Sequence, residues 1–319
     1  MTTPQTVGLV GTGVVGGRVR RRVTTIRPDA HVVEIDTRVH DPASSPLVEP
    51  LDVVILAQPG PHRHDAVRFL RRGVPVVSVG DQVDDVRALI DLDGLAEECG
   101  VPLVVGAGMS PGLVGLLARY LARSFEAVDE LHIALHGTAG PACARQHHRA
   151  LDGTATILHD GVEYSSPTGT GRLLSWFPEP VGPYDCYRAE VPAPFVLRRA
   201  FPTVERIQAR MSANRRDRLT ARLPMLTPPH REGGTGAIRV EVRGVDRDGA
   251  RLTLIGGVAE LVGTATAATA VAFADLVLDG GLEPGLAVPG SRSDHNVRLL
   301  RAVERLGVRL QEFTGVPSA

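Results

Sequence analysis

Short apolar runs alternate with longer amphipathic segments from the start of the chain to about residue 123. Apolar runs of this kind are typical of parallel strands that are covered on both faces of a sheet. They lie at Thr6 to Val10, His31 to Ile35, Val53 to Ala57, Val74 to Val79 and Pro102 to Val105. The amphipathic segments predict helices at Val14 to Val23, His62 to Arg72, Asp84 to Cys99 and Pro111 to Ala122. This alternation predicts an α/β fold with a doubly wound parallel sheet of the Rossmann type.

After residue 124 the pattern changes to longer strands in which apolar and polar residues alternate. They are expected at Glu130 to His136, Glu205 to Ser212, Ala237 to Gly244 and Arg251 to Val258. The last two are joined by a segment with Asp-Gly, which favours a hairpin turn. Helices are expected at Thr264 to Leu278 and Asp294 to Arg305.

These patterns divide the chain into two domains. Residues 1–123 are expected to form the Rossmann domain. Residues 124–263 should form an α+β domain with an antiparallel sheet, for substrate binding and dimerisation. The two late helices would pack back on the first domain, so that residues 264–319 complete it.

A glycine-rich turn, Gly11-Thr12-Gly13-Val14-Val15-Gly16, follows the first predicted strand and opens the first predicted helix. In the G-x-G-x-x-G pattern Gly11 permits the tight turn, Gly13 lets a pyrophosphate approach the backbone, and Gly16 lets the helix pack close to the strand. The free N–H groups at the helix N-terminus would face the phosphates. The turn therefore predicts a dinucleotide-binding site. The alternative is that the glycines serve packing alone.

Asp36 stands 20 positions after Gly16 (36 minus 16), at the end of the second predicted strand. Its carboxylate can accept hydrogen bonds from the adenosine ribose and would repel a 2′-phosphate, so NAD is favoured over NADP. Thr37 and Arg38 keep NADP open, because an arginine at this place can meet a 2′-phosphate. The segment from Asp36 to Val53 is too short for a helix, a strand and another helix, so the sheet should be shortened at this edge.

A second glycine-rich turn lies within Val104 to Gly115. Its spacing does not fit a pyrophosphate, and no acid follows at the ribose distance. Ser110 can cap the next helix and Pro111 suits the first helical position, so this helix N-terminus should point to the carboxyl edge of the sheet. A capped core helix without any ligand is the alternative.

Several strand ends are expected to surround the nicotinamide ring or the substrate at the carboxyl edge of the sheet. Gly106 to Gly112 should form the floor beneath them, with Gly108 next to the cofactor and with Met109 and Ser110 next to the substrate. The segments Ala57-Gln58-Pro59-Gly60 and Ser78-Val79-Gly80-Asp81 should border the nicotinamide ribose and carboxamide.

Two segments, Val74 to Arg119 and Gly256 to Ser291, resemble the saccharopine dehydrogenase-like family. Members of this family are NAD(P)-dependent oxidoreductases that form or cleave a C–N bond between an amino acid and a carbonyl carbon. The resemblance implies a two-domain Rossmann fold, a nicotinamide cofactor, and hydride transfer at the C–N centre of an amino-acid-like substrate. It does not supply the identity of that substrate.

The segment Gly140 to Leu151 gathers several polar side chains. If it is helical, Cys143 and His147 share a face at i, i+4, and a thiolate beside an imidazole is the arrangement of a covalent dehydrogenase that acts on an aldehyde. A simpler role is proton transfer, with His147 or His148 as the general acid or base. Asp81 is a further candidate for this proton. The alternative is a pair of histidines on a solvated helix face.

Two arginine-rich segments, Pro183 to Arg188 and Ser212 to Arg222, are candidates for binding a substrate carboxylate. A guanidinium group binds a carboxylate through two parallel hydrogen bonds. Arg188 and Arg215 are the preferred residues for this role. Solvated ion pairs are the alternative.

Composition narrows the chemistry further. All 35 basic residues are arginine, and the absence of lysine excludes Schiff-base chemistry and any lysine acid or base. The net charge of -1 gives no indication of nucleic-acid binding, and no window is apolar enough for a membrane span. Three widely spaced cysteines favour reduced thiols, so neither a disulfide framework nor a metal is expected. No secretion signal is visible, and a cytoplasmic location is expected.

The sequence thus predicts an NAD(P)-dependent oxidoreductase that acts at a C–N centre of a small, carboxylate-bearing molecule. A homodimer is expected, because the exposed sheets of such second domains commonly build dimers. Two alternatives remain open: a semialdehyde dehydrogenase that depends on Cys143, and a non-catalytic protein that senses NAD(P).

Overall fold

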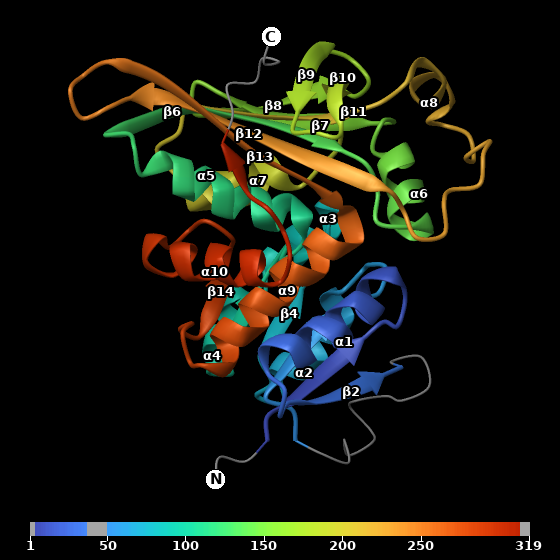
Figure 1. Ribbon diagram of the computed structural model, residues 1–319, viewed down its shortest axis with the longest axis vertical. Coiled ribbons are helices and arrows are strands. Elements are labelled where there is room, and N and C mark those ends of the chain that lie inside the picture. The colour runs from blue at the N-terminus through green and yellow to red at the C-terminus, as the bar shows by residue number, and fades with distance from the viewer. Residues whose placement is uncertain (1–3, 37–49, 313–319) are drawn as a thin grey trace.

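The computed structural model describes residues 4–36 and 50–312, and these residues form two β-sheets connected by helices (Figure 1). The first sheet consists of parallel strands in the spatial order β14-β5-β4-β3-β1-β2. In chain order these strands are β1 (Thr6–Val10), β2 (His31–Ile35), β3 (Val53–Leu56), β4 (Val76–Ser78), β5 (Pro102–Val104) and β14 (Gly285–Ala287). The predicted Rossmann-type sheet is confirmed.

The strand order determines where a ligand can bind. The chain passes from β1 outward to β2, and then in the opposite direction through β3, β4 and β5. Right-handed crossovers therefore put α1 (Val14–Ile26) on one face, and α2 (Arg63–Leu70), α3 (Val83–Ile90) and α4 (Asp93–Glu98) on the other. In open α/β sheets, ligands bind in the crevice at this switch point, here between the carboxyl ends of β1 and β3.

β2 is the edge strand of this sheet within the described residues. Thr37 and Arg38, the residues that keep NADP open, lie outside the described residues. β2 ends at Ile35, and Asp36 directly after it is the last described residue before the gap that follows this strand.

The helix expected from Asp84 to Cys99 is divided into α3 and α4. Asp93, the first residue of α4, accepts a hydrogen bond from the backbone N–H of Leu286 in β14, at 2.8 Å. The prediction of a single helix was therefore wrong. The hydrogen bond at the start of α4 joins residues almost 200 positions apart in the sequence (286 minus 93 is 193). Such a contact leaves no local signal.

The second sheet has the strand order β15-β13-β12-β6-β11-β10-β9, with β7 and β8 attached beside β11. The strands are β6 (Ala127–His136), β7 (Thr154–His159), β8 (Val162–Pro167), β9 (Leu173–Phe177), β10 (Gly182–Arg188), β11 (Arg206–Ser212), β12 (Thr235–Val245), β13 (Arg251–Leu261) and β15 (Gln311–Glu312). The predicted hairpin is confirmed as β12 and β13.

The expectation of a purely antiparallel second sheet is wrong at one pair, because β6 and β11 run parallel. Parallel neighbours need a long crossover connection. Here the crossover contains α6 (Pro141–Arg149), four strands and α7 (Ala193–Ala200). The sequence pattern predicted β6, β11, β12 and β13, but it predicted neither β7 to β10 nor β15, and it does not show which strands become neighbours.

A buried helix, α9 (Val262–Leu278), follows β13 directly and connects the two parts of the fold (Figure 1). It packs against α1, β3 and β4, while β14 beyond it pairs with β5 and α10 (Ser293–Arg305) packs against α9 and α5 (Val114–Ala122). α5 also packs against β12 and β13 of the second sheet. Within the described residues, no helix combines the length and apolar character needed to cross a membrane.

The glycine turn between β1 and α1 is shaped by two close approaches. Gly11 has a φ of 100°, and a Cβ atom there would lie 2.5 Å from the backbone nitrogen of Gln58. A Cβ atom on Gly16 would overlap the carbonyl oxygen of Gly11. Both positions therefore require glycine so that β1 can turn into α1 beside β3.

We predict that Gly16→Ala lowers the free energy of unfolding by about 1–3 kcal/mol, because the added methyl group must displace backbone. Gly17→Ala is the matched control in the same helix, since nothing lies within 4 Å of its added Cβ. This control should be neutral or should stabilise the protein by up to about 1 kcal/mol. Urea unfolding of both variants tests the prediction, and equal stabilities would contradict it.

Candidate active site

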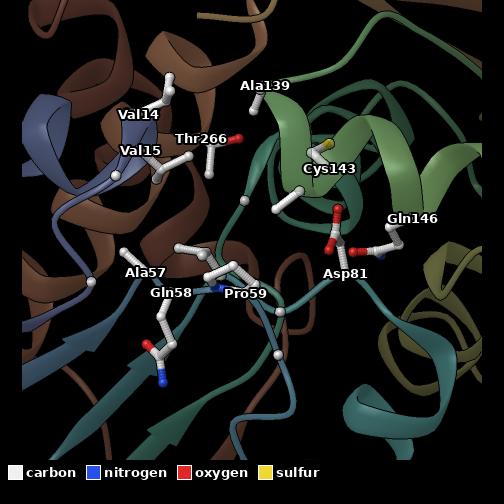
Figure 2. A pocket seen from close by; sticks show the side chains of 18 of the residues that line it. Val14, Val15, Ala57, Gln58, Pro59, Asp81, Ala139, Cys143, Gln146 and Thr266 are labelled. Atoms are coloured by element: carbon white, nitrogen blue, oxygen red, sulfur yellow. The ribbon is translucent and has the colours of Figure 1, made fainter. Parts of the chain in front are cut away.

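One cavity of about 1170 Å³ lies where the carboxyl edge of the first sheet meets the second sheet and α6 (Figure 2). It is lined by the glycine turn, by strand ends of the first sheet, and by the segment from the end of β6 into α6. Predicted residues on its wall are Gly11, Thr12, Gly13, Val14, Val15, Asp36, Ala57, Gln58, Pro59, Gly80, Asp81, Gly108, Met109, Ser110, Cys143 and His147. Gly16 is not among the residues that line the cavity.

Gly13 differs from the other two glycines of the turn. Among the described residues, nothing lies within 4 Å of a Cβ built on it, whereas Gly11 and Gly16 are fixed by contacts within the protein. Gly13 is the N-cap of α1, its φ is -74°, and it lines the cavity. Neither packing nor backbone conformation explains a glycine here. The empty space over it fits a dinucleotide pyrophosphate at the helix N-terminus.

The strand ends beneath the cavity are braced by a buried histidine that the sequence patterns did not single out. His62 is 1% exposed, and its ring joins Ser78 Oγ through Nδ1 and the carbonyl oxygen of Gln58 through Nε2, each at 2.8 Å. Its backbone N–H donates to Asp85 Oδ1, at 2.8 Å. His62 thus fixes β3 relative to β4 and has no free nitrogen for a ligand.

The second glycine turn reaches the cavity, but its helix does not begin as predicted. Regular helix starts at Val114, after a wide helical turn at Met109–Leu113, and Ser110 forms no capping hydrogen bond. A Cβ on Gly106 would lie 2.6 Å from Cγ of Pro111, so the turn is folded tightly back on itself. Ser110 Oγ is buried, has no hydrogen-bond partner among the described residues, and belongs to a cavity-lining residue.

Thr266 of α9 supports this second turn. Its hydroxyl oxygen accepts a hydrogen bond from the backbone N–H of Met109, at 3.2 Å, and Thr266 itself lines the cavity. No sequence pattern indicates this contact, because Thr266 stands in an alanine-rich helix with 157 positions between the two residues (266 minus 109). A C-terminal helix thus forms part of the cavity wall.

Asp81, Cys143 and His147 meet in the cavity, and Figure 2 shows Asp81 directed toward α6. His147 Nε2 lies 3.7 Å from Cys143 Sγ and 3.9 Å from Asp81 Oδ2. The predicted i, i+4 pair on one helix face is thus present. The carboxylate comes from the loop between β4 and α3, so this group joins elements from both parts of the fold.

The surroundings favour the imidazolium form of His147. Burial lowers its pKa, but the charges of Cys143 and Asp81 and hydrogen bonds to Cys143 and the Gly137 backbone outweigh this, and the pKa rises from 6.5 to about 9. Gly137 has a φ of 83°, and a Cβ there would lie 2.5 Å from the Cα of Gly236. The loop that orients His147 is therefore held closely against β12.

The ligand atoms of Asp81, Cys143 and His147 all lie within 4.8 Å of one another, close enough to share a metal ion. Asp81, Cys143 and His147 would hold such an ion, and it would supply Lewis-acid chemistry in the cavity. The same geometry also serves a thiolate and imidazolium pair without a metal.

The N-terminus of α6 packs against the glycine turn between β1 and α1. A Cβ on Gly140, the N-cap of α6, would lie 3.2 Å from Cγ2 of Val14 at the start of α1. Across the cavity, the side-chain amide of Gln82 donates to Oε1 of Gln146, at 3.4 Å. These contacts place Cys143, in the first turn of α6, beside the predicted dinucleotide site.

The structure does not bring three predicted residues to the cavity. His148 is buried, and its Nε2 lies 3.0 Å and 3.1 Å from the carbonyl oxygens of Thr220 and Leu223. Arg188 donates to Thr170 Oγ1, at 3.4 Å, and Arg215 begins α8 (Arg215–Thr220). None of the three is among the residues that line the cavity. Their side chains were assigned from local composition, which does not report direction.

Two other arginines stand at the cavity instead. Arg145 and Arg149 are exposed residues of α6 that line it, and they are spaced i, i+4 on that helix. They are one helical turn apart, so both guanidinium groups can reach one anionic group. The sequence already showed Arg145 and Arg149 at i, i+4 in the same segment as Cys143 and His147, but the prediction preferred Arg188 and Arg215.

The fold resembles that of saccharopine dehydrogenase (L-Glu forming) from Saccharomyces cerevisiae, with a TM-score of 0.67 and 13% identity over 97% of this chain and 100% of the yeast chain. Weaker likenesses are an engineered D-amino acid dehydrogenase bound to NADP+ (TM-score 0.49, 15% identity, 91% of this chain and 94% of that chain) and a meso-dapdh mutant from Clostridium tetani E88 (0.48, 13%, 88% and 92%). No family model and no curated protein matches the chain. At this identity the yeast structure confirms the expected fold.

We predict that the His147 ring titrates near pH 9 when followed by NMR of its imidazole resonances. Between pH 6.5 and about 9 the folded protein retains a proton that the unfolded chain has lost. The resulting stabilisation is complete below pH 6.5 and is lost as the pH rises through about 9. In Cys143→Ser the titration midpoint of His147 should fall, because the substitution removes a charge that raises the pKa of this ring. A midpoint at or below 6.5 in the unaltered protein would contradict the charged state assigned to His147.

Proposed function

We propose that this protein is an NAD(P)-dependent oxidoreductase that transfers a hydride at a C–N or carbonyl carbon of an amino-acid-like molecule. One observation carries the proposal: a single cavity is lined both by Gly11 to Val15 of the glycine turn with Asp36 and by Asp81, Cys143 and His147. The proposed cofactor cleft and a group of ionisable side chains thus share one cavity. The likeness to a dehydrogenase fold supports the same reaction class.

The dinucleotide would lie across the carboxyl ends of β1 and β3. The N-terminus of α1 would face its pyrophosphate over Gly13, and Asp36 would accept hydrogen bonds from the adenosine ribose. Ala57, Gln58, Gly80 and Gly108 line the way toward α6, where the nicotinamide end would lie. When bound, this cofactor accepts or donates the hydride. The position of Asp36 supports NAD as the preferred form.

His147 is the proposed acid and base for the substrate proton. Hydride addition to C=N or C=O leaves a nitrogen or oxygen that takes up a proton, and the reverse reaction releases one. A pKa of about 9 keeps His147 protonated at neutral pH, so it is ready to donate. Its partner Asp81, at 3.9 Å, keeps a negative charge near the ring after the proton has left.

The substrate is proposed to be an amino-acid-like molecule with a carboxylate. Arg145 and Arg149 at the cavity offer two guanidinium groups for that carboxylate. Asp81 and Asp85 on the other side of the cavity offer negative charges for an amino group. This division of charge suits a zwitterion whose reacting carbon lies between the two groups.

We predict that the protein melts at a higher temperature with NAD or NADH, and that NADP and NADPH have a smaller effect. A ligand at 100 times its dissociation constant adds about 2.7 kcal/mol of apparent stability. Gly13→Ala should fold normally but lose this effect, because its methyl group enters the space proposed for the pyrophosphate and touches no protein atom within 4 Å. Thermal melting with each of the four nucleotides measures both outcomes.

Gly17→Ala serves as the matched control, because its added Cβ is equally free of contacts but Gly17 does not line the cavity. It should respond to nucleotide like the unaltered protein. Asp36→Ala should reduce the preference for NAD over NADP. No stabilisation by any of the four nucleotides would refute the proposed function.

A further inference from the structure

Cys143 has surroundings that neither of the other cysteines shares. It lines the cavity, lies in the first turn of α6, and has His147 Nε2 at 3.7 Å. A cysteine at a helix N-terminus with an imidazole beside it has the geometry of nucleophilic cysteines in covalent catalysis. Thiolates are the reactive form of cysteine in covalent catalysis.

The two remaining cysteines provide internal comparisons. Cys186 is fully buried in β10, and burial raises the pKa of its thiol to about 11. Cys99 lies at the end of α4, partly exposed, and does not line the cavity. The chain therefore carries one thiol built into the proposed active site and two outside it.

We propose that Cys143 is a covalent nucleophile and that the substrate of the cleft is an aldehyde that also bears a carboxylate. This inference rests on the proposed function and narrows it, because it makes an aldehyde carbon the hydride donor. Cys143 would hold that carbon through sulfur, while Arg145 and Arg149 would bind the distant carboxylate. The substrate class is thus a semialdehyde.

The reaction balances with the oxidised nicotinamide as oxidant and water as co-reactant. Cys143 sulfur bonds to the aldehyde carbon, and the carbonyl oxygen takes a proton from His147, which gives a thiohemiacetal. His147 then removes that proton, C=O forms again, and the C–H bond breaks so that its electron pair leaves as hydride. Water adds to the resulting thioester, the C–S bond breaks, and the products are a carboxylate, the Cys143 thiolate and two protons overall.

Two polar side-chain atoms beside the cavity provide support that does not depend on Cys143, because they could bind the oxygen atoms of a reacting substrate or of water. Asp85 is 4% exposed and lines the cavity, and its Oδ2 has no hydrogen-bond partner within residues 4–36 and 50–312. Ser110 Oγ is also buried and unpartnered on the same cavity. Buried polar atoms normally form hydrogen bonds, so both atoms are available to a ligand in the cavity. A hydroxyl donor suits the oxygen of a thiohemiacetal, and a carboxylate oxygen suits the water that attacks a thioester.

The test uses 4-nitrophenyl acetate without nucleotide, so that it does not depend on cofactor binding. Attack by Cys143 should release 4-nitrophenolate and leave one acetyl group on this residue, located by peptide mass. Cys143→Ser should lose this reaction, and His147→Gln should slow it by about 100-fold or more. Cys99→Ser is the matched control and should react like the unaltered protein. Acetylation spread equally over Cys99 and Cys143 would overturn the proposal.

A second measurement separates the nucleophile from a metal site. Treatment with a chelator should leave acetylation of Cys143 unchanged. If chelation changes the rate, or if added Co²⁺ gives a thiolate charge-transfer band that Cys143→Ser lacks and that blocks acetylation at micromolar metal, the three side chains form a metal site and the proposal fails.

A third measurement tests the substrate class. Succinic semialdehyde with NAD or NADP should give reduced nicotinamide, and Cys143→Ser should abolish this turnover. Acetylation of Cys143 together with an absence of turnover would overturn the semialdehyde. Absence of both acetylation and turnover, in a protein that nucleotide stabilises, would overturn the nucleophile while the proposed cofactor cleft stands.

Discussion

The cleft depends on how closely the start of α1 can approach the end of β1. A Cβ on Gly16 would overlap the carbonyl oxygen of Gly11, and a Cβ on Gly11 would lie 2.5 Å from the backbone of Gln58. These two contacts fix β1, α1 and β3 at a spacing that larger residues cannot reach. The N-terminus of α1 is then held over the switch point of the sheet. Gly13 has no such contact with the described residues, and the space that a side chain would occupy there is part of the cavity.

The proposed chemistry needs a second element on the opposite wall. α6 supplies it, because Gly140 lets its first turn pack against Val14 while Gln146 contacts Gln82 across the cavity. The pKa of His147 is raised mainly by its neighbours Cys143 and Asp81, which come from different parts of the fold. Neither part alone would produce the same group. The buried helix α9 joins the two parts, so packing in the core and geometry in the cleft are coupled.

Local patterns were sufficient to predict β1 to β5 of the first sheet, the glycine turn and the Cys143–His147 pair, because strand period, glycine spacing and i, i+4 spacing are properties of short segments. They did not predict β14, the short strand that completes this sheet from the far end of the chain. They were insufficient where tertiary contacts decide. The parallel pairing of β6 with β11, the bracing of Gln58 by His62 and the support of Met109 by Thr266 join distant segments. Arg188 and His148 were predicted to serve the site, but their side chains form hydrogen bonds outside the cavity, with Thr170 and with the carbonyl oxygen of Thr220.

The central claim is that the nicotinamide end of the cofactor and the group around His147 share one reaction space. A crystal structure of the protein with the nucleotide that stabilises it tests this claim most directly. We expect the nicotinamide ring to lie between Gly108 and α6, close enough for a substrate carbon to stand about 3.5 Å from both the ring and Cys143. A nicotinamide ring turned away from α6, or a nucleotide bound outside the cavity, would contradict the claim.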